Sequence, residues 1–427
     1  MNFKNALIDA KQQFSNNNPK SKEYYLNACK YIPGGTTRSI LIQDPFPLTF
    51  VSGIEAELID MDNHKYLDML GDYTAGLFGH SNKDIIHSVI TAMETNMSVG
   101  GVHPGEAKLA KLMCERFRLE CVRFTNSGTE ANLMAITAVL HASPPERKTI
   151  LVFKGGYHGN VLNFKSDDAI PENAPYSFLI GIYNDTEHTL NLIKENAKSL
   201  AGILIEPMLG SGGCIPATRY FLESIFFEIK KIGAFCIVDE VQTSRHNQNG
   251  MISTLTTHIP DIITYGKYIG GGFSFGAFGG NRSLLEPIGT TLKHSGTFNN
   301  NISTITAACT VLNTIYTCDI AHIHTRNGNL FLEKIQSIIQ KYNVPLVVSG
   351  YGSVMTFHAC KKIPTTLHDL KDKDMNLQEL LVHYFLEKGI YIGSRGLITI
   401  TLTHTISQLN YFLQQFEDIL QHFSMLV

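Results

Sequence analysis

Four short stretches of this chain combine a reactive side chain with neighbours suited to chemistry. The first centres on Lys267, which follows the apolar run Ile262–Tyr265 and precedes the glycines at 270–272. A lysine at the end of a buried strand is desolvated, which lowers its pKa and makes its amine a candidate nucleophile. Lysines more often reach solvent along their apolar stems, but the apolar run and the glycines favour the buried arrangement here.

Two carboxylates end a second apolar run. Asp239 and Glu240 follow the apolar residues 234–238, and open α/β sheets bind ligands at the carboxyl ends of their strands. A buried aspartate at that place needs a partner, which a protonated ring nitrogen or a metal ion would provide. A helix cap after the strand is the structural alternative.

A third stretch, residues 124–132, has the pattern of a phosphate site. A strand is expected to lead into a helix that begins near Thr129, with Ser127 and Glu130 at the spacing of a capping box. The amides at the start of such a helix attract phosphate, and Gly128 lets the backbone approach a ligand closely. An ordinary capped helix explains the same residues equally well.

The fourth stretch is Gly155-Gly-Tyr-His-Gly159, directly after an expected strand. Glycines on both sides let the ring of Tyr157 lie flat over a ligand, although a tight turn with a core tyrosine is the commoner explanation for this stretch alone. Together the four stretches contain an amine, a ring-nitrogen partner, a stacking ring and a phosphate site, which are the parts that hold pyridoxal phosphate.

In these motifs, and in their order from about Tyr31 to the C-terminus, the sequence resembles the class III, fold-type I aminotransferases that depend on pyridoxal phosphate. The spacing from Asp239 to Lys267 also fits that family. The resemblance implies an α/β fold with a large domain built on a mainly parallel seven-stranded sheet, plus a smaller α+β domain. It further implies pyridoxal 5′-phosphate as the cofactor and a homodimer with shared active sites.

The resemblance also assigns roles to individual residues. Lys267 matches the Schiff-base lysine and Asp239 the aspartate that keeps the ring nitrogen protonated, and with Tyr157 they form the expected catalytic set. Tyr157 and Val241 match the residues on the two faces of the ring, and Glu206 matches a glutamate near the phenolic oxygen of the cofactor. The other implied cofactor contacts are Ser127, Gly128, Thr129, Gln242 and Thr297, of which Thr297 reaches the phosphate in the other subunit.

Further motifs narrow the substrate to two subgroups of that family. Tyr31-Ile-Pro-Gly-Gly35 is similar to the glutamate-1-semialdehyde aminomutases, whereas Thr37-Arg-Ser39 and Ser394-Arg-Gly396 are similar to the β-amino acid (β-phenylalanine) aminotransferases. By this second resemblance Arg38, Arg395 and Tyr73 bind the substrate. Each arginine can bind a carboxylate with two parallel hydrogen bonds, although a surface arginine in a turn is the structural alternative.

The expected activity is therefore a ping-pong transamination from an aromatic or aliphatic β-amino acid to a keto acid such as 2-oxoglutarate. The alternative is a glutamate-1-semialdehyde 2,1-aminomutase, which needs no keto acid acceptor. A racemase, epimerase or decarboxylase on the same cofactor, or a cofactor-binding scaffold without activity, are further interpretations. The sequence departs from many family members at Ser244-Arg-His246, which borders the expected site, and Gln242 stands where both subgroups often carry Met.

Short apolar runs and helical periodicities supply the elements that must position these residues. Antiparallel strands are expected within residues 48–70, and the middle of the chain alternates strands with helices, which predicts a mainly parallel sheet. The strands expected there are Val122–Thr125, Thr149–Phe153, Gly202–Ile205, Ala234–Asp239, Ile262–Tyr265 and Phe275–Phe278. A single helix is expected over Ile302–Ile315, and a last helix over Gln408–Phe423.

Three parts follow from this pattern: an N-terminal segment 1–65 that packs with the small domain, a large cofactor-binding domain 66–325, and a small domain 326–427. The content of 44% hydrophobic and 17% charged residues predicts a globular chain. Its formal charge of −3 provides no excess of positive charge that would attract nucleic acid or an anionic membrane. Eight scattered cysteines, none spaced CxxC, predict reduced thiols, no zinc site and a cytoplasmic location.

Overall fold

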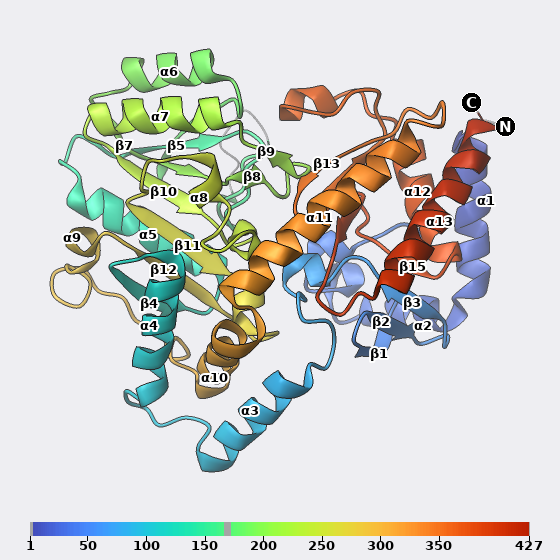
Figure 1. Cartoon of the computed structure of the whole chain (residues 1–427), viewed down its shortest axis with the longest axis horizontal. Coiled ribbons are helices and arrows are strands. Elements are labelled where there is room, and N and C mark those ends of the chain that lie inside the picture. Colours follow the sequence, from blue (N-terminus) through green and yellow to red (C-terminus); the bar gives the residue numbers. More distant parts are fainter. Residues whose placement is uncertain (1–2, 166–171, 427) are drawn as a thin grey trace. The chain divides into compact units, whose positions relative to one another are not determined.

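The computed structural model describes residues 3–165 and 172–426, which form two compact units (Figure 1). Unit 1 comprises Met1–Asn82, Asn327–Ile363 and Leu370–Val427, and unit 2 comprises Lys83–Arg326 and Pro364–Asp369. The domain limits expected from the sequence stay predictions. No helix in the described ranges is long and apolar enough to cross a membrane.

Unit 2 is built on a seven-stranded sheet in the order β4-β12-β11-β10-β7-β5-β6. Its strands are β4 (Cys121–Thr125), β5 (Thr149–Phe153), β6 (Ser177–Gly181), β7 (Leu200–Ile205), β10 (Phe235–Asp239), β11 (Ile262–Gly266) and β12 (Gly276–Gly280). Strand β12 runs antiparallel to both of its neighbours, and the other pairs are parallel. The mainly parallel seven-stranded sheet is therefore confirmed.

The central strands of this sheet are buried on both faces, as their continuous apolar runs predict. The sequence predicts six of the strands, and each is present within one or two residues of its predicted ends. The seventh, β6, has only the run Phe178–Ile180 at its centre, and this run is too short to distinguish from a loop by pattern.

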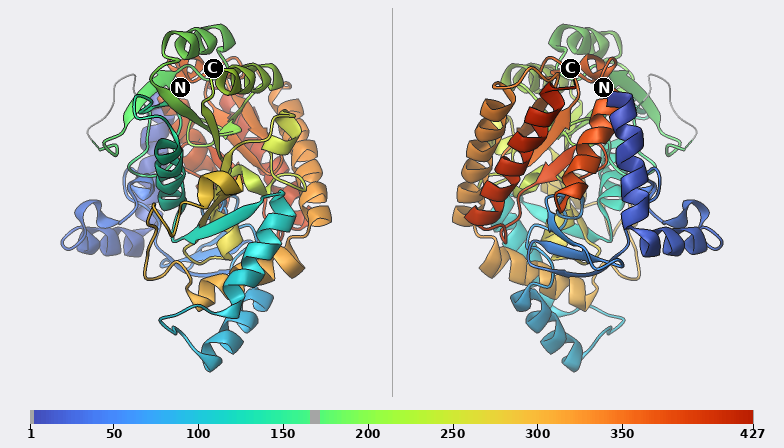
Figure 2. Two further views of the ribbon diagram at one scale, coloured as in Figure 1. Left: turned by 90° about the vertical axis from the view of Figure 1, so that its left-hand side faces the viewer. Right: turned by 90° about the vertical axis from the view of Figure 1, so that its right-hand side faces the viewer.

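Helices surround the sheet of unit 2 (Figures 1 and 2). They are α3 (Lys83–Thr95), α4 (Pro104–Phe117), α5 (Gly128–Ala142), α6 (Thr186–Glu195), α7 (Arg219–Lys231), α8 (Ile252–Leu255), α9 (Arg282–Leu285) and α10 (Ile302–Thr310). Helix α5 packs on β11 and β12, with Ala131, Ala135 and Val139 in the core. Helices α6 and α7 lie side by side in all three views.

Two sequence-based expectations about unit 2 need correction. The helix expected over residues 302–315 is α-helical only to Thr310 and continues as a π-turn over Val311–Ile315. The capping box at α5 is also only half formed: Ser127 Oγ accepts from the Glu130 amide, but the Glu130 carboxylate accepts from the Asn126 amide instead of that of Ser127. The side chain of Asn126 also donates to the same carboxylate oxygen at 3.3 Å, which favours that alternative.

Unit 1 contains two small sheets and helices from both ends of the chain. The first sheet joins the antiparallel strands β1 (Phe50–Ile54), β2 (Glu57–Asp60) and β3 (Lys65–Asp68) to β15 (Ile390–Tyr391), and the second is formed by β13 (Val347–Tyr351), β14 (Val354–His358) and β16 (Leu397–Thr399). The helices are α1 (Phe3–Asn17), α2 (Pro19–Ala28), the C-terminal part of α11 (Cys318–Ile339), α12 (Met375–Glu387) and α13 (Ile406–Ser424).

Helix α1 packs on α12 in unit 1, and its first residue lies close to the end of α13 (Figure 2), where the Phe3 and Phe423 rings are 5.9 Å apart. The predicted C-terminal helix is confirmed because its apolar residues, Phe412, Phe416, Ile419 and Leu420, all enter one buried core.

Candidate active site

Lys267 stands directly after β11, at the start of a short 3₁₀ turn. Its φ of 52° lies in the left-handed region, which a non-glycine residue seldom adopts outside sites where the surroundings enforce it. Burial lowers the pKa of the Lys267 amine to about 8, while the nearby carboxyls of Asp239 and Glu206 counteract that effect. The lysine therefore has a substantial neutral fraction near neutral pH.

Asp239 ends β10 with its carboxylate almost fully buried, 4% exposed. Its Oδ1 accepts from the Val241 amide at 2.9 Å, and its Oδ2 accepts from Asn132 Nδ2 at 2.8 Å and lies 2.8 Å from His158 Nδ1. These hydrogen bonds to both oxygens offset the cost of burying the carboxyl group.

The partners of Asp239 were not identified as functional residues from the sequence. Asn132 lies one turn into α5 and is fixed by Thr264, whose Oγ1 donates to Asn132 Oδ1 at 2.7 Å. Thr264 in turn pairs with Asp239 across the β10–β11 ladder. The only sequence signal was that Asn132 and His158 belong to the motifs at 124–132 and 155–159; their contact with Asp239 depends on the fold.

Glu206 follows β7 and also lies in this cluster. Its Oε2 accepts from the Tyr157 amide and its Oε1 from the Gly210 amide, each at 3.0 Å. Burial raises the pKa of Glu206 to about 7, partly opposed by His158 and reinforced by Asp239. Tyr157 itself keeps 41% of its surface exposed, which leaves area on its side chain for contact with a ligand.

The N-terminus of α5 has the close packing expected of a cradle. A Cβ on Gly128 would lie 2.8 Å from Val241 Cγ2, so only glycine fits against the segment that follows β10. Thr129 packs against Gly159 in the same way, and Gly210 approaches Gln242. The structure therefore brings Ser127, Gly128, Thr129, Tyr157, Glu206, Asp239, Val241, Gln242 and Lys267 together within unit 2.

The segment Ser244–His246, which departs from the expected family pattern, is fully buried. Arg245 is 0% exposed, and burial lowers its pKa to about 10. Tyr268 donates to the Ser244 carbonyl at 3.1 Å, and Tyr316 donates to the Arg245 carbonyl at 2.6 Å. The charge of Arg245 acts on Lys267 and contributes to the lowering of its pKa, so the sequence departure bears directly on the reactive amine.

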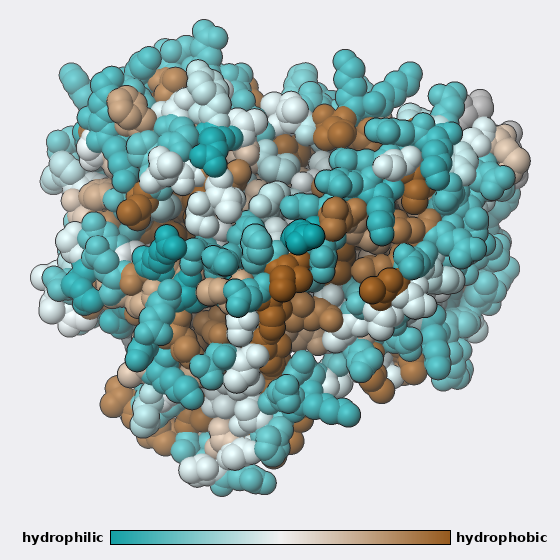
Figure 3. Space-filling model, in the orientation of Figure 1, coloured by the Kyte–Doolittle hydropathy of each residue, from teal (hydrophilic) through white to brown (hydrophobic). Residues whose placement is uncertain are grey.

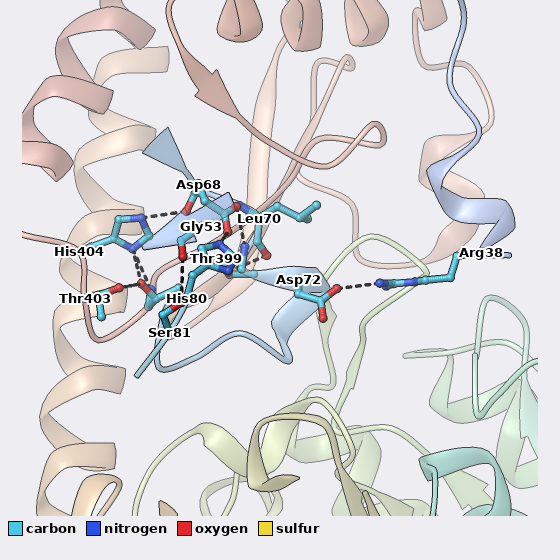
Figure 4. Close-up of polar contacts among 12 residues, drawn as sticks. Arg38, Gly53, Asp68, Leu70, Asp72, His80, Ser81, Thr399, Thr403 and His404 are labelled. Atoms are coloured by element: carbon cyan, nitrogen blue, oxygen red, sulfur yellow. Dashed lines mark hydrogen bonds and ion pairs between the residues drawn. The ribbon is translucent and has the colours of Figure 1, made fainter. Parts of the chain in front are cut away.

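The expected substrate residues form a second cluster, in unit 1. Arg38 Nη1 donates to Asp72 Oδ1 at 2.7 Å (Figure 4), and its guanidinium lies 5.1 Å from the centroid of the Tyr73 ring. Burial raises the pKa of the Tyr73 phenol, and the positive charges of Arg38 and Arg395 oppose that rise. Both arginines therefore act on one tyrosine.

Two further expectations from the sequence concern the position of Thr297 and the binding of a metal ion. Thr297 is exposed on the loop between α9 and α10. Among the residues that the structure describes, no group of three or more His, Cys, Asp or Glu side chains could hold a metal ion.

The fold is that of the fold-type I enzymes that use pyridoxal phosphate. A solved structure described as a novel β-phenylalanine aminotransferase from Variovorax paradoxus superimposes with a TM-score of 0.97, at 37% identity and with 99% of each chain covered. A glutamate-1-semialdehyde aminomutase from Pseudomonas aeruginosa shares the fold alone, with a TM-score of 0.88, 17% identity and 98% of each chain covered.

The sequence matches point to one family. The model of the class III aminotransferases matches residues 43–422. The β-phenylalanine transaminase of Variovorax paradoxus is 39% identical over 95% of this chain and 94% of its own, and a glutamate-1-semialdehyde 2,1-aminomutase of Methanosphaera stadtmanae is 30% identical over 88% and 91%. The chain belongs to the class III aminotransferases, whose cofactor is pyridoxal 5′-phosphate.

Proposed function

We propose that the chain transfers the amino group of a β-amino acid to a keto acid such as 2-oxoglutarate by ping-pong transamination. The observation that carries the substrate class is the Arg38 guanidinium 5.1 Å from the centroid of the Tyr73 ring, together with Arg395, whose charge acts on the same tyrosine. An arginine binds a carboxylate with two parallel hydrogen bonds, and two arginines suit an enzyme that accepts a β-amino acid and a dicarboxylic keto acid in turn. The 39% identity to a protein named β-phenylalanine transaminase supports the same substrate class.

The residues of unit 2 fit pyridoxal phosphate by their donor set and their shape. The N-terminus of α5, where Gly128 allows close packing, has backbone amides that can bind a phosphate. The exposed side chain of Tyr157 has an aromatic face that can stack on a ring. Asp239, which is held by three donors, presents a buried negative charge to a ring nitrogen. We assign Val241 to the opposite face of the ring, Glu206 to the side of its phenolic oxygen, and Gln242 to the residues that contact the cofactor.

Bound pyridoxal phosphate supplies an aldehyde and a ring that withdraws electrons. In the proposed mechanism Lys267 Nζ, neutral at its lowered pKa, takes the proton from the substrate carbon that carries the amine. Asp239 holds its negative charge in place, since Asn132, His158 and the Val241 amide fix both of its oxygens. Arg38 or Arg395 binds the carboxylate of the substrate with two parallel hydrogen bonds.

We also propose that the enzyme acts as a homodimer, with Thr297 reaching the phosphate bound in the other subunit. Apolar side chains are exposed on α3 and the segment after it: Ile86, Ile90, Met93, Met97, Val99 and Val102. Figure 3 shows apolar surface at its lower end, where Figure 1 places α3. Val102 is 90% exposed. Grouped exposed apolar side chains of this kind mark interaction surfaces, and Thr297 is exposed in the same unit. The cytoplasmic location stays a prediction.

The test of the proposed function is the requirement for an acceptor. Purified enzyme with pyridoxal phosphate is incubated with racemic β-phenylalanine, with and without 2-oxoglutarate, and the glutamate formed is measured by chromatography. The proposal expects repeated turnover and stoichiometric glutamate only when 2-oxoglutarate is present.

A glutamate-1-semialdehyde 2,1-aminomutase is the second candidate, favoured by relatives of that name at 27–30% identity. It would isomerise glutamate 1-semialdehyde with no added acceptor and would leave β-phenylalanine unchanged. That pair of results would replace the proposed substrate class.

A further inference from the structure

The backbone between residues 71 and 74 adopts a conformation that residues with side chains avoid. The φ angle is 54° at Gly71, 43° at Asp72, 51° at Tyr73 and 78° at Thr74. A single non-glycine residue with positive φ is uncommon, and three in succession persist only where surrounding contacts fix them. We call residues 71–74 the left-handed turn.

The left-handed turn carries two of the contacts that hold Arg38. Asp72 accepts from Arg38 Nη1 at 2.7 Å, and the Tyr73 ring lies 5.1 Å from the same guanidinium. The Tyr73 hydroxyl donates to the Ile40 carbonyl at 3.3 Å, which ties the turn to the segment that follows Arg38. The position of the Arg38 guanidinium therefore depends on the conformation of this turn.

Asp68, at the end of β3, fixes the entry to the turn (Figure 4). Its Oδ1 accepts from the amides of Leu70 and Gly71 at 2.9 and 3.0 Å, and its Oδ2 lies 2.9 Å from His80 Nε2. The carboxylate is 3% exposed. One buried side chain thus holds the backbone on the N-terminal side of the strained residues and is itself held by His80.

Neighbouring residues bond to and pack closely around the backbone at the start of the left-handed turn. Thr399 Oγ1 donates to the Leu70 carbonyl at 2.9 Å, and a Cβ on Gly71 would lie 2.5 Å from that same Oγ1. His404 Nε2 lies 3.0 Å from the Asp68 carbonyl. On the far side of His80, a Cβ on Gly53 would lie 2.7 Å from the ring, so a glycine is required there to make space for it.

We propose that Asp68, supported by His80, is the positioning residue of the carboxylate subsite at Arg38. It touches neither substrate nor cofactor. It acts by holding the left-handed turn, which in turn places Asp72 and Tyr73 against the guanidinium. The inference rests on the proposed function, because it takes the ligand of Arg38 to be the carboxylate of the β-amino acid.

The test is the dissociation constant of 3-phenylpropanoate, which carries the carboxylate and the ring but no amine, measured by calorimetry on the enzyme loaded with cofactor. Asp68→Ala and His80→Leu should each weaken binding about tenfold or more, since a displacement of about 1 Å in a binding group is already costly. Asp68→Asn keeps an oxygen for the two amides, and His80→Gln keeps a donor for Asp68; both should bind within about threefold of the wild type.

Asp60 offers a matched control in the same unit. It is a buried aspartate whose Oδ2 lies 3.0 Å from His64 Nδ1 and accepts from the Tyr66 hydroxyl at 3.1 Å, but it does not contact the turn. Asp60→Ala should lower the melting temperature without weakening 3-phenylpropanoate binding. An equal loss of binding in this control would overturn the proposal, because the effect would then be general destabilisation.

Arg38→Gln separates failure of the inference from failure of the proposed function. If Arg38→Gln weakens binding while Asp68→Ala and His80→Leu do not, the positioning role is wrong and the subsite stands. If Arg38→Gln leaves binding unchanged, Arg38 is not the carboxylate site and the inference fails; the proposed function fails only if 2-oxoglutarate does not support turnover of β-phenylalanine. Should Asp68→Ala not fold, His80→Leu, which leaves both backbone hydrogen bonds of Asp68 in place, gives the decision.

Discussion

The lowered pKa of Lys267 makes a quantitative prediction about how the enzyme takes up its cofactor. Only the neutral amine attacks the aldehyde of pyridoxal phosphate. With the pKa near 8 instead of its ordinary 10.5, about a quarter of the lysine is neutral at pH 7.5, against about one part in a thousand for an unperturbed lysine. The rate of cofactor uptake should therefore be about two hundred times that expected of an ordinary lysine at that pH.

The assay is the growth of visible absorbance when pyridoxal phosphate is mixed with the cofactor-free enzyme, followed from about pH 6 to pH 10. The rate should rise with pH and level off above about pH 8, since deprotonation of Lys267 creates the reactive form. A rate that keeps rising to about pH 10.5 would refute the desolvation of Lys267.

Two variants should move that midpoint in opposite directions. Glu206→Gln removes a carboxyl that is ionised above about pH 7 and stabilises the lysine ammonium, so the midpoint should fall. Arg245→Met removes a buried positive charge that disfavours the ammonium, so the midpoint should rise. Glu240→Gln is the control, because it removes another buried carboxyl, one that faces the Ile252 amide. Midpoints that shift in the same direction for Glu206→Gln and Arg245→Met would refute the electrostatic account.

Three further predictions follow from the two clusters and the exposed surface. Asp239→Asn replaces one acceptor oxygen by an amide nitrogen that must face a donor, so the free energy of unfolding should fall by about 1–3 kcal/mol. Denaturant titration measures this change, and an unchanged stability would contradict the arrangement of three donors around Asp239. Arg38→Gln should raise the KM for β-phenylalanine about tenfold or more with a smaller change in kcat, and equal effects on an amine without a carboxylate would exclude a carboxylate site. Ile90→Glu, on the exposed face of α3, should yield monomers in light scattering, whereas Tyr220→Glu, at another exposed position, should not. A dimeric Ile90→Glu protein would place the interface elsewhere.

The sequence predicts the elements whose residues reveal themselves by pattern. Strands β10 and β11 are continuous apolar runs buried on both faces, so the amino-acid pattern alone locates their ends, and with them Asp239 and Lys267. Helix α13 is equally visible through its periodicity. Strand β6 is missed because a run of three apolar residues carries too little information.

The finer parts of the site depend on contacts between distant residues. Asn132, His158 and Thr264 come from three separate stretches and meet only when α5, the loop after β5 and β11 assemble around Asp239. The left-handed turn is not predictable either, because three successive residues with side chains rarely adopt positive φ; tertiary contacts impose it. Arg245 is expected at the border of the site, but a charged residue in a polar stretch gives no sign of its full burial.

One half-reaction of the enzyme tests whether it takes the amino group from a β-amino acid. Enzyme loaded with pyridoxal phosphate is mixed with racemic β-phenylalanine in the absence of any keto acid, and the absorbance spectrum is followed. The account predicts loss of the visible band of the lysine-bound cofactor and growth of the pyridoxamine phosphate band at shorter wavelength. An unchanged spectrum, from enzyme that isomerises glutamate 1-semialdehyde without an acceptor, would contradict it.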